Sequence, residues 1–385
     1  MTETRYRAGR YVRQPQGYLA FIPAPLPPHP PIKMDDEMVA LLSDADRALG
    51  RLDGSIQTLP DPEIFVFMYV RKEAVLSSQI EGTQSSLNDV LEAEAAITDP
   101  TRPRDVDEVL NYVDAMNHGL ARLADLPVST RLLREIHQRL LRDVRGAEKH
   151  PGELRSTQNW IGGGGATLRE ASFVPPPVHE LSSALADFER FLHSGDPIPA
   201  LIRIGLAHAQ FETIHPFLDG NGRVGRLLIT FLLCERGTLI KPVLYISHYF
   251  KRHRVMYYEL LQSIRDEGDW ESWLKFFLRG MAEVSREATE TARRIVALRE
   301  EHRSLIVDQF GRVVGNALMV LERLYTRPYV SVNEIARMTD VSYPAASSLM
   351  SKFVEHDLLN ETTGRARNRR FRYTSYIDIF AEDER

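Results

Sequence analysis

The chain has 385 residues, enough for two or three domains, and its 43% hydrophobic and 26% charged side chains are typical of a globular protein. The formal net charge of −5 argues against a protein that binds polyanions over its whole surface, although a local basic patch stays compatible with it. The single cysteine, Cys234, excludes an intramolecular disulfide.

The same features predict a cytoplasmic protein with no membrane partner. The N-terminus carries charge but no apolar stretch, so it does not resemble a signal peptide. The longest apolar run, residues 227–234, is too short to cross a bilayer. Cys234 lies in this run, and we interpret it as a small core residue and not as a nucleophile.

The first segment with a clear composition is proline-rich and covers residues 14–31. It predicts an extended arm with polyproline character, packed along the protein's own surface. A helix begins near Pro62, because Asp61 is a suitable N-cap and proline is favoured at the first helical position. Gly82 should end or kink that helix.

Helical periodicity then dominates the chain as far as residue 307. Residues 222–236 are hydrophobic nearly all round, which predicts a central, buried helix. Two or three further helices should fill residues 249–307. The helices expected before them cover residues 34–51, 63–79, 85–97, 106–123, 130–143, 178–192, 199–213 and 222–236.

One long segment, residues 145–177, breaks this helical pattern. It contains four consecutive glycines at 162–165 and three consecutive prolines at 175–177. We expect a loop with a short hairpin, and long loops inside a compact domain are usually functional or disordered.

The residues after Gly311 have a different pattern and predict a second domain. A helix over 316–324 precedes a capping box, in which Ser331 is the N-cap and Glu334 follows three residues later. A third helix over 342–356 and two strands within 358–373 complete three helices and a wing. This arrangement resembles a winged helix-turn-helix.

The wing predicts either DNA binding or protein docking, and the sequence leaves both open. Five arginines are enough for contacts to phosphates, but the presumed recognition helix offers few groups that read bases. The wing arginines are Arg365, Arg367, Arg369, Arg370 and Arg372, and the helix residues are Ser342, Tyr343, Ser347, Ser348 and Lys352.

Residues 215–226, with the sequence HPFLDGNGRVGR, join two predicted helices. The Gly-Asn-Gly stretch tolerates positive φ, so its amides can point into one concavity at the start of the second helix, which suits phosphate. Arg223 and Arg226 share a helix face beside it and indicate a polyphosphate. Asp219 suits Mg²⁺, and His215 can accept a proton. The alternative is a tight turn with a capping asparagine and surface arginines.

The segment matches the Fic signature HPF-x-[D/E]-GN-G-R-x-x-R at every defined position, and the chain resembles a bacterial Fic protein over roughly residues 60–300. The resemblance implies a mainly α fold with a Fic-type helical catalytic domain, a short β-hairpin flap and a C-terminal winged helix-turn-helix domain. The expected boundaries are 1–105 for an N-terminal Fic-associated segment, 106–308 for the catalytic domain and 309–385 for the winged helix.

The resemblance further implies a protein adenylyltransferase, which transfers AMP from ATP to a Ser, Thr or Tyr hydroxyl of a target protein and of itself. His215 would deprotonate the hydroxyl, Asp219 would bind Mg²⁺ and Arg226 would hold the γ-phosphate. The other implied ATP contacts are Gly220, Asn221, Gly222 and Arg223 at the phosphates and Tyr257, Tyr258 and Leu261 near the adenine. An aromatic pair on a helix is also a common core feature. Relatives that transfer phosphate typically carry lysine at the position of Gly222.

Two more elements follow from the resemblance. Residues 161–174 would form a flap that covers the phosphates and binds the target along its edge, whereas the alternative is an ordinary mobile loop. Ser77, Glu81 and Gly82 fit the inhibitory pattern [S/T]-x-x-x-E-[G/N]. Glu81 would pair with Arg226 and occupy the γ-phosphate site, whereas the alternative is a solvated glutamate near a helix end.

Two other functions stay open. The same site could remove AMP from a modified protein, or the chain could be a DNA-binding regulator that only senses ATP. The intact His215 argues against a pure sensor, which needs no base. The target protein and the signal that lifts inhibition are not encoded in any recognisable pattern, and a homodimer is compatible with the sequence.

Overall fold

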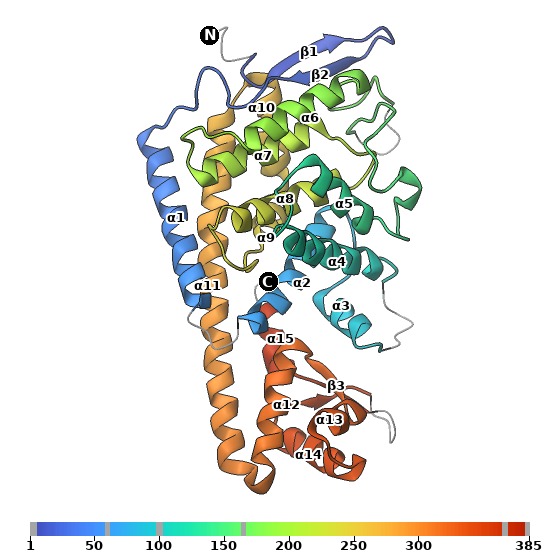
Figure 1. Cartoon of the computed structure of the whole chain (residues 1–385), viewed down its shortest axis with the longest axis vertical. Helices are drawn as coiled ribbons and strands as arrows, with labels where there is room; N and C mark the ends of the chain where they lie inside the picture. The colour runs from blue at the N-terminus through green and yellow to red at the C-terminus, as the bar shows by residue number, and fades with distance from the viewer. Residues whose placement is uncertain (1–5, 58–61, 98–102, 163–166, 364–368, 382–385) are drawn as a thin grey trace.

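The computed structural model describes residues 6–57, 62–97, 103–162, 167–363 and 369–381. The fold is mainly helical, with a two-stranded and a three-stranded antiparallel sheet (Figure 1), which confirms the predicted fold class. The expected N-cap Asp61 and the wing residues Arg365 and Arg367 lie outside the described residues.

The helices up to residue 214 lie within about six residues of the expected ranges, whereas the strands β1 and β2 were not expected. The elements of this part are β1 (Gly9–Arg13), β2 (Leu19–Pro23), α1 (Asp36–Gln57), α2 (Glu63–Ile80), α3 (Leu87–Glu94), α4 (Val106–Arg122), α5 (Thr130–Leu140), α6 (Val178–Leu192) and α7 (Ala200–Ile214). The later ones are α8 (Asn221–Glu235), α9 (Ile246–Arg252), α10 (Arg254–Glu267), α11 (Trp270–Gln309), α12 (Val314–Thr326), β3 (Tyr329–Ser331), α13 (Val332–Thr339), α14 (Tyr343–Glu355), β4 (Asn360–Glu361), β5 (Arg370–Arg372) and α15 (Thr374–Ala381).

Helices α7 and α8 form the centre of the core. Every residue from Leu201 to Ile214 is buried, and α8 is buried from Arg223 to Leu233, as its continuous apolar sequence predicts. Cys234 follows at intermediate exposure, and burial raises the pKa of its thiol to about 12. The turn between these two helices therefore has a rigid support on both sides.

The proline-rich segment differs from the expected polyproline arm. It contributes β2, which pairs with β1 in antiparallel register, so that Tyr11 faces Phe21 and Arg13 faces Leu19. The amide of Phe21 also donates to the carbonyl of Val174 at 2.9 Å. Pro23 is the last residue of β2 and the other prolines lie outside the strand, so none interrupts it, and this hairpin is packed against the protein as expected.

Helix α11 runs the length of the molecule, with α1 packed along its first half and α12 against its second (Figure 1). No helix among the described residues has the length and apolar character needed to cross a membrane.

The C-terminal unit contains the three-stranded sheet β3-β5-β4 and the helices α12 to α15. The predicted capping box is present, since Ser331 and Glu334 exchange side-chain-to-backbone hydrogen bonds. The three wing arginines that the structure describes bond within the chain. Arg369 donates to Ser347 at 2.8 Å, Arg370 pairs with Glu334 at 3.0 Å and Arg372 pairs with Asp378 at 3.3 Å.

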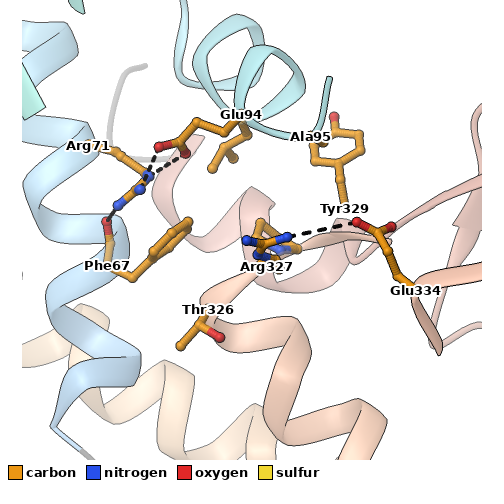
Figure 2. Close-up of a pocket in the computed structure, with 10 residues that line it drawn as sticks. Phe67, Arg71, Glu94, Ala95, Thr326, Arg327, Tyr329 and Glu334 are labelled. Carbon is orange, nitrogen blue, oxygen red and sulfur yellow. Dashed lines mark hydrogen bonds and ion pairs between the residues drawn. The ribbon is translucent and has the colours of Figure 1, made fainter. Parts of the chain in front are cut away.

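The C-terminal unit also contacts α2, the helix that carries the predicted inhibitory segment. The buried Lys72 donates to the carbonyl of Phe380 in α15 at 3.0 Å, and the Tyr376 hydroxyl donates to the carbonyl of Ile64 at 3.0 Å. A cavity of about 280 Å³ separates α2 and α3 from α12 and β3 (Figure 2). In its wall, Arg71 forms a two-pronged ion pair with Glu94, with both contacts at 2.6 Å.

Candidate active site

The turn between α7 and α8 reverses the chain through two left-handed residues. His215 ends α7 with φ of 50°, and Gly220 precedes α8 with φ of 75°. The Asn221 side chain fixes the turn, because its Oδ1 accepts from the Phe217 amide at 2.9 Å and its Nδ2 donates to the Phe217 carbonyl at 2.8 Å. Asn221 therefore shapes the turn through its side chain.

His215 is partly buried and neutral at pH 7. Burial, followed by the charge of Arg265, lowers the pKa of His215 to about 4. Its Nδ1 lies 3.4 Å from the Glu212 carbonyl, which can only accept, so Nδ1 carries the proton and Nε2 keeps its lone pair. Arg155 and Asn159 donate to the His215 carbonyl at 3.0 and 3.4 Å.

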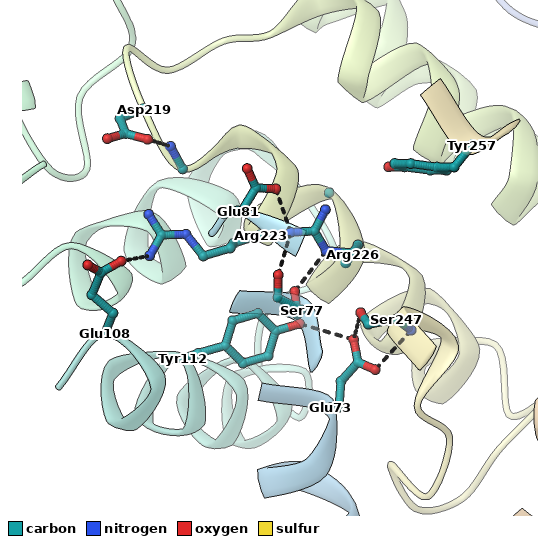
Figure 3. Close-up of polar contacts among 12 residues, drawn as sticks. Glu73, Ser77, Glu81, Glu108, Tyr112, Asp219, Arg223, Arg226, Ser247 and Tyr257 are labelled. Carbon is teal, nitrogen blue, oxygen red and sulfur yellow. Dashed lines mark hydrogen bonds and ion pairs between the residues drawn. The ribbon is translucent and has the colours of Figure 1, made fainter. Parts of the chain in front are cut away.

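Arg226 joins α8 to α2 and makes the contact that the inhibitory pattern implies. Its Nη2 donates to Glu81 at 2.7 Å and to the Ser77 carbonyl at 3.0 Å, while Nε donates to Ser77 Oγ at 2.8 Å (Figure 3). Burial alone would raise the pKa of Glu81, but the adjacent Arg226 charge holds it below its usual value. Gly82 follows at φ of +98°, as expected for the end of α2.

The Glu81 carboxylate lies against the first turn of α8. A side chain at Gly222 would place its Cβ 2.4 Å from Glu81 Oε1 and 3.1 Å from an Arg226 nitrogen. No side chain caps α8 at Gly220, and a helix start of this kind favours a nearby negative charge. Glu81 therefore occupies the place where the sequence predicts a phosphate group.

Arg223, the second predicted phosphate contact, bonds instead to a carboxylate that the sequence analysis did not identify. Its Nη1 donates to Glu108 of α4 at 3.1 Å, and Arg145 reaches the same carboxylate at 3.2 Å. Arg223 Nε is buried and has no hydrogen-bond partner among the described residues. Arg223 thus keeps a free donor beside its ion pair.

Asp219, the predicted magnesium ligand, lies at the end of the turn. Its Oδ1 accepts from the Gly220 amide at 2.6 Å, and a Cβ at Gly146 would meet its Oδ2 at 2.9 Å. The described residues contain no cluster of three or more His, Cys, Asp or Glu that could hold a metal by themselves. A single carboxylate beside an anion site nevertheless fits Mg²⁺, which completes its shell with phosphate oxygens and water.

His137 of α5 supports Asp219 from behind and was also missed. Its Nδ1 accepts from the Gly152 amide at 2.8 Å, so its Nε2 must be the protonated nitrogen that donates to the Asp219 carbonyl at 3.0 Å. Its ring stacks on Phe217 with centroids 3.9 Å apart. Burial lowers the pKa of His137 to about 4, which keeps this tautomer neutral.

The predicted adenine contacts divide into buried and accessible residues. Tyr257 is buried, and its hydroxyl lies 2.9 Å from Nε2 of the equally buried His208. Leu261 is buried as well, whereas Tyr258 is 42% exposed. In this arrangement only Tyr258 offers a face to a ligand, and Tyr257 belongs to the core.

A buried polar network lies beneath the Ser77–Arg226 contact. Glu73 is one helical turn before Ser77 and accepts from the Ser247 amide at 3.1 Å, from the Ser247 hydroxyl, and from Tyr112 at 3.3 Å (Figure 3). Burial raises the pKa of Glu73 to about 7. This network links α2 to α4 and α9 and fixes the position from which Ser77 contacts Arg226.

The described part of the flap, residues 161–174 without 163–166, begins and ends as a strand pair. Ile161 and Phe173 exchange backbone hydrogen bonds at 2.8 and 3.2 Å. Ile161 is 37% exposed, whereas Phe173 is buried beneath the Arg265 guanidinium, 3.8 Å from its ring centroid. The flap is therefore fixed at its base beside His215.

The fold and the site together define a mainly helical protein in which a glutamate of the chain itself lies against the start of α8. A family model described as Fic/DOC family N-terminal matches residues 39–121, and one described as Fic/DOC family matches residues 127–233. Through these two regions the chain belongs to the Fic/DOC family, which confirms the resemblance seen in the sequence.

Relatives named protein adenylyltransferase Fic match part of the chain. Those of Culex quinquefasciatus and Drosophila yakuba are 33% and 30% identical over 204 and 239 residues, or 51% and 60% of this chain. The chain spans only 37% and 43% of their lengths. A crystal structure of a Fic family protein from Desulfovibrio desulfuricans G20 is 20% identical, with a TM-score of 0.58, and the match covers 89% of this chain and 97% of that one. This last match shows a shared fold.

Proposed function

We propose that this protein is an adenylyltransferase that transfers AMP from ATP to a hydroxyl side chain of a target protein and of itself, and that Glu81 inhibits it. One observation carries the proposal: the Glu81 carboxylate bonds to Arg226 and lies against Gly222 at the start of α8. An anion of the chain itself thus fills an anion site beside a neutral histidine. The relatives named protein adenylyltransferase Fic support the same reaction.

The turn supplies the groups that this reaction needs. The target hydroxyl oxygen attacks the α-phosphorus of ATP, its proton passes to Nε2 of His215, and pyrophosphate leaves. The neutral state of His215 suits a general base at pH 7. The amides around Gly220, Asn221 and Gly222 would bind the α- and β-phosphates, and the free Nε of Arg223 would add a donor.

Two further roles concern charge. Arg226 would hold the γ-phosphate once Glu81 leaves it, since one guanidinium cannot serve both anions equally well. Asp219 would hold Mg²⁺, which would offset the negative charge of the phosphates when bound. Tyr258 would pack against the adenine, with Tyr257 and Leu261 behind it.

The reverse reaction, removal of AMP from a modified protein, uses the same residues and stays a second candidate. One observation favours this reverse reaction: the Glu81 side chain is 32% exposed, so it could orient a water molecule near the phosphates. Purified protein with Glu81 intact should then release AMP from a modified target faster than Glu81→Gly does.

The C-terminal unit is proposed to dock proteins and not DNA. Arg369, Arg370 and Arg372 already bond within the chain, and each such bond reduces the charge available to phosphates. The cytoplasmic location and a homodimer remain proposals based on the sequence. DNA affinity at low salt that is lost in a double Arg369→Ala, Arg370→Ala variant would show instead that the C-terminal unit binds DNA.

Labelled ATP tests the reaction class. Wild type and Glu81→Gly are incubated with ATP labelled at the α-phosphate and, separately, at the γ-phosphate. Label on protein from the α position alone supports adenylyl transfer, whereas label from the γ position alone indicates phosphate transfer. No label from either position in Glu81→Gly, with ATP bound, would leave the ATP-sensing regulator as the better explanation.

A further inference from the structure

A groove of about 460 Å³ lies between the N-terminal hairpin and the flap. The hairpin forms one wall, the flap forms the other, and α10 closes one side. The residues that matter here are Tyr11, Arg13, Leu19, Arg169, Ser172 and Asp266.

The groove has an excess of positive charge. Residues 6–34 contain no Asp or Glu, and in the part of the chain that the structure describes neither Arg13 nor Arg169 forms an ion pair. Both side chains are exposed, and Arg169 donates only to the Gln16 carbonyl, at 3.3 Å. The Asp266 carboxylate accepts from Tyr11 at 2.8 Å and from a neighbouring glutamine, so it neutralises neither arginine.

The groove lies one layer of side chains away from the catalytic turn. Phe173 forms part of its wall and packs beneath Arg265. Arg265 in turn donates to the Thr213 hydroxyl at 3.2 Å and to the Glu212 carbonyl at 3.3 Å, immediately before His215. Because an extended chain spans about 3.3 Å per residue, a target whose hydroxyl lies at His215 reaches the groove within a few residues.

We infer that this groove binds an acidic, extended segment of the protein target, close in sequence to the residue that receives AMP. Guanidinium groups bind carboxylates with two parallel hydrogen bonds, and the exposed Tyr11 and Leu19 add apolar surface to the same groove. The inference rests on the proposed function and adds a substrate class to it, namely proteins modified beside acidic residues.

Two synthetic peptides of equal length test the inference, each with one Ser, one Thr and one Tyr, flanked by glutamates in one and by lysines in the other. Binding is measured by fluorescence anisotropy with the full chain carrying Glu81→Gly. The acidic peptide should bind more tightly than the basic one, and its binding should weaken at high salt. A double Arg13→Glu, Arg169→Glu variant should bind it about tenfold more weakly, because each exposed ion pair contributes modestly. Reversing both charges together prevents a new pair between the two positions.

Arg10→Glu is the matched control, because residues 10 and 13 lie on opposite faces of β1 and Arg10 does not line the groove. It should leave binding unchanged. Equal binding of the two peptides, or equal losses in Arg10→Glu and in the double variant, would overturn the inference. Since binding requires no transfer, these results are independent of the proposed reaction, which fails only if Glu81→Gly incorporates no α-phosphate label.

Discussion

Two arginine–glutamate pairs flank the first turns of α8, and they differ in what surrounds them. Arg223 and Glu108 are both buried, with side chains 2% and 7% exposed, and Arg145 adds a second cation to Glu108. Arg226 is equally buried, but its partner Glu81 is 32% exposed and lies at the C-terminal end of α2. Arg223–Glu108 is thus an enclosed pair, and Arg226–Glu81 is an open pair whose glutamate reaches solvent.

The difference indicates that one pair is permanent and the other exchangeable. A buried charge that loses its partner is strongly destabilised, and Glu108 is held by Arg223 and Arg145 together, so this pair should be permanent. Glu81 can leave Arg226 by a small movement of a helix end, and water can then solvate it. A ligand phosphate could replace Glu81 at Arg226, whereas Glu108 should stay in place.

Neither pair is expected to transfer a proton, so the largest expected effect belongs to His215. In the Glu81→Gly background, His215→Ala should reduce AMP transfer by about 10²–10⁴-fold, because a general base is lost. ATP affinity should stay nearly unchanged, since both arginines remain. Transfer is measured with α-labelled ATP and affinity by calorimetry; an unchanged rate would show that another group accepts the proton.

The enclosed pair should matter most for stability. Glu108→Gln leaves Arg223 buried beside a neutral group and should lower the free energy of unfolding by about 3 kcal/mol. Glu81→Gln, the matched variant of the open pair, should lower it by about 1 kcal/mol or less, since water screens Glu81. Urea denaturation of both variants tests the comparison, and equal losses would mean that the pairs are equivalent.

The open pair should control activity. Glu81→Gly should raise α-phosphate labelling by about ten- to a hundredfold, because a hydrogen bond to a charged group contributes roughly 1.5–3 kcal/mol to the inhibited state. Arg226→Ala breaks the same pair but also removes the group that would hold the γ-phosphate, so its activity should stay low. The measurement is the rate of self-modification without any partner protein.

These two variants distinguish specific inhibition from general loosening of the fold. General loosening would lower the melting temperature and the activity of both. A folded Glu81→Gly protein without any gain, or an equal gain in Arg226→Ala, would contradict a role for the open pair.

Sequence reasoning could identify the open pair but not the enclosed one, for a physical reason. His215, Asp219 and both arginines follow one another along a single turn, so their spacing is visible in the sequence. Glu81 is distant, but it belongs to a recognisable short pattern beside a glycine.

The residues that sequence reasoning missed lie alone on other helices. Glu108 on α4 and His137 on α5 look like ordinary polar residues of amphipathic helices, and only the packing of α4 and α5 against α8 brings them to the turn. A buried lone histidine or glutamate has no local signal. The strand β2 was missed because prolines at 15, 23 and 25 suggested an arm, although residues 19–22 form a continuous apolar run that is also compatible with a strand.

We expect the contacts of His137, like those of the enclosed pair, to stay in place when a ligand binds. Its two ring nitrogens allow a sharp test of what these contacts do. In His137→Gln the amide nitrogen can take the place of Nε2 and still donate to the Asp219 carbonyl. In His137→Asn the amide oxygen can take the place of Nδ1 and accept only from Gly152. Both variants lose the stacking on Phe217 equally, so their difference isolates the bond to Asp219.

If that bond positions the carboxylate of Asp219, the Mg²⁺ concentration needed for half-maximal transfer should rise about tenfold more in His137→Asn than in His137→Gln, as expected for one hydrogen bond of about 1.4 kcal/mol. The measurement is a Mg²⁺ titration of α-phosphate labelling in the Glu81→Gly background. Melting temperatures control for folding and should fall equally. A purely structural role for His137 would lower activity in both variants without separating their Mg²⁺ dependence, because protein that stays folded would retain the same carboxylate geometry.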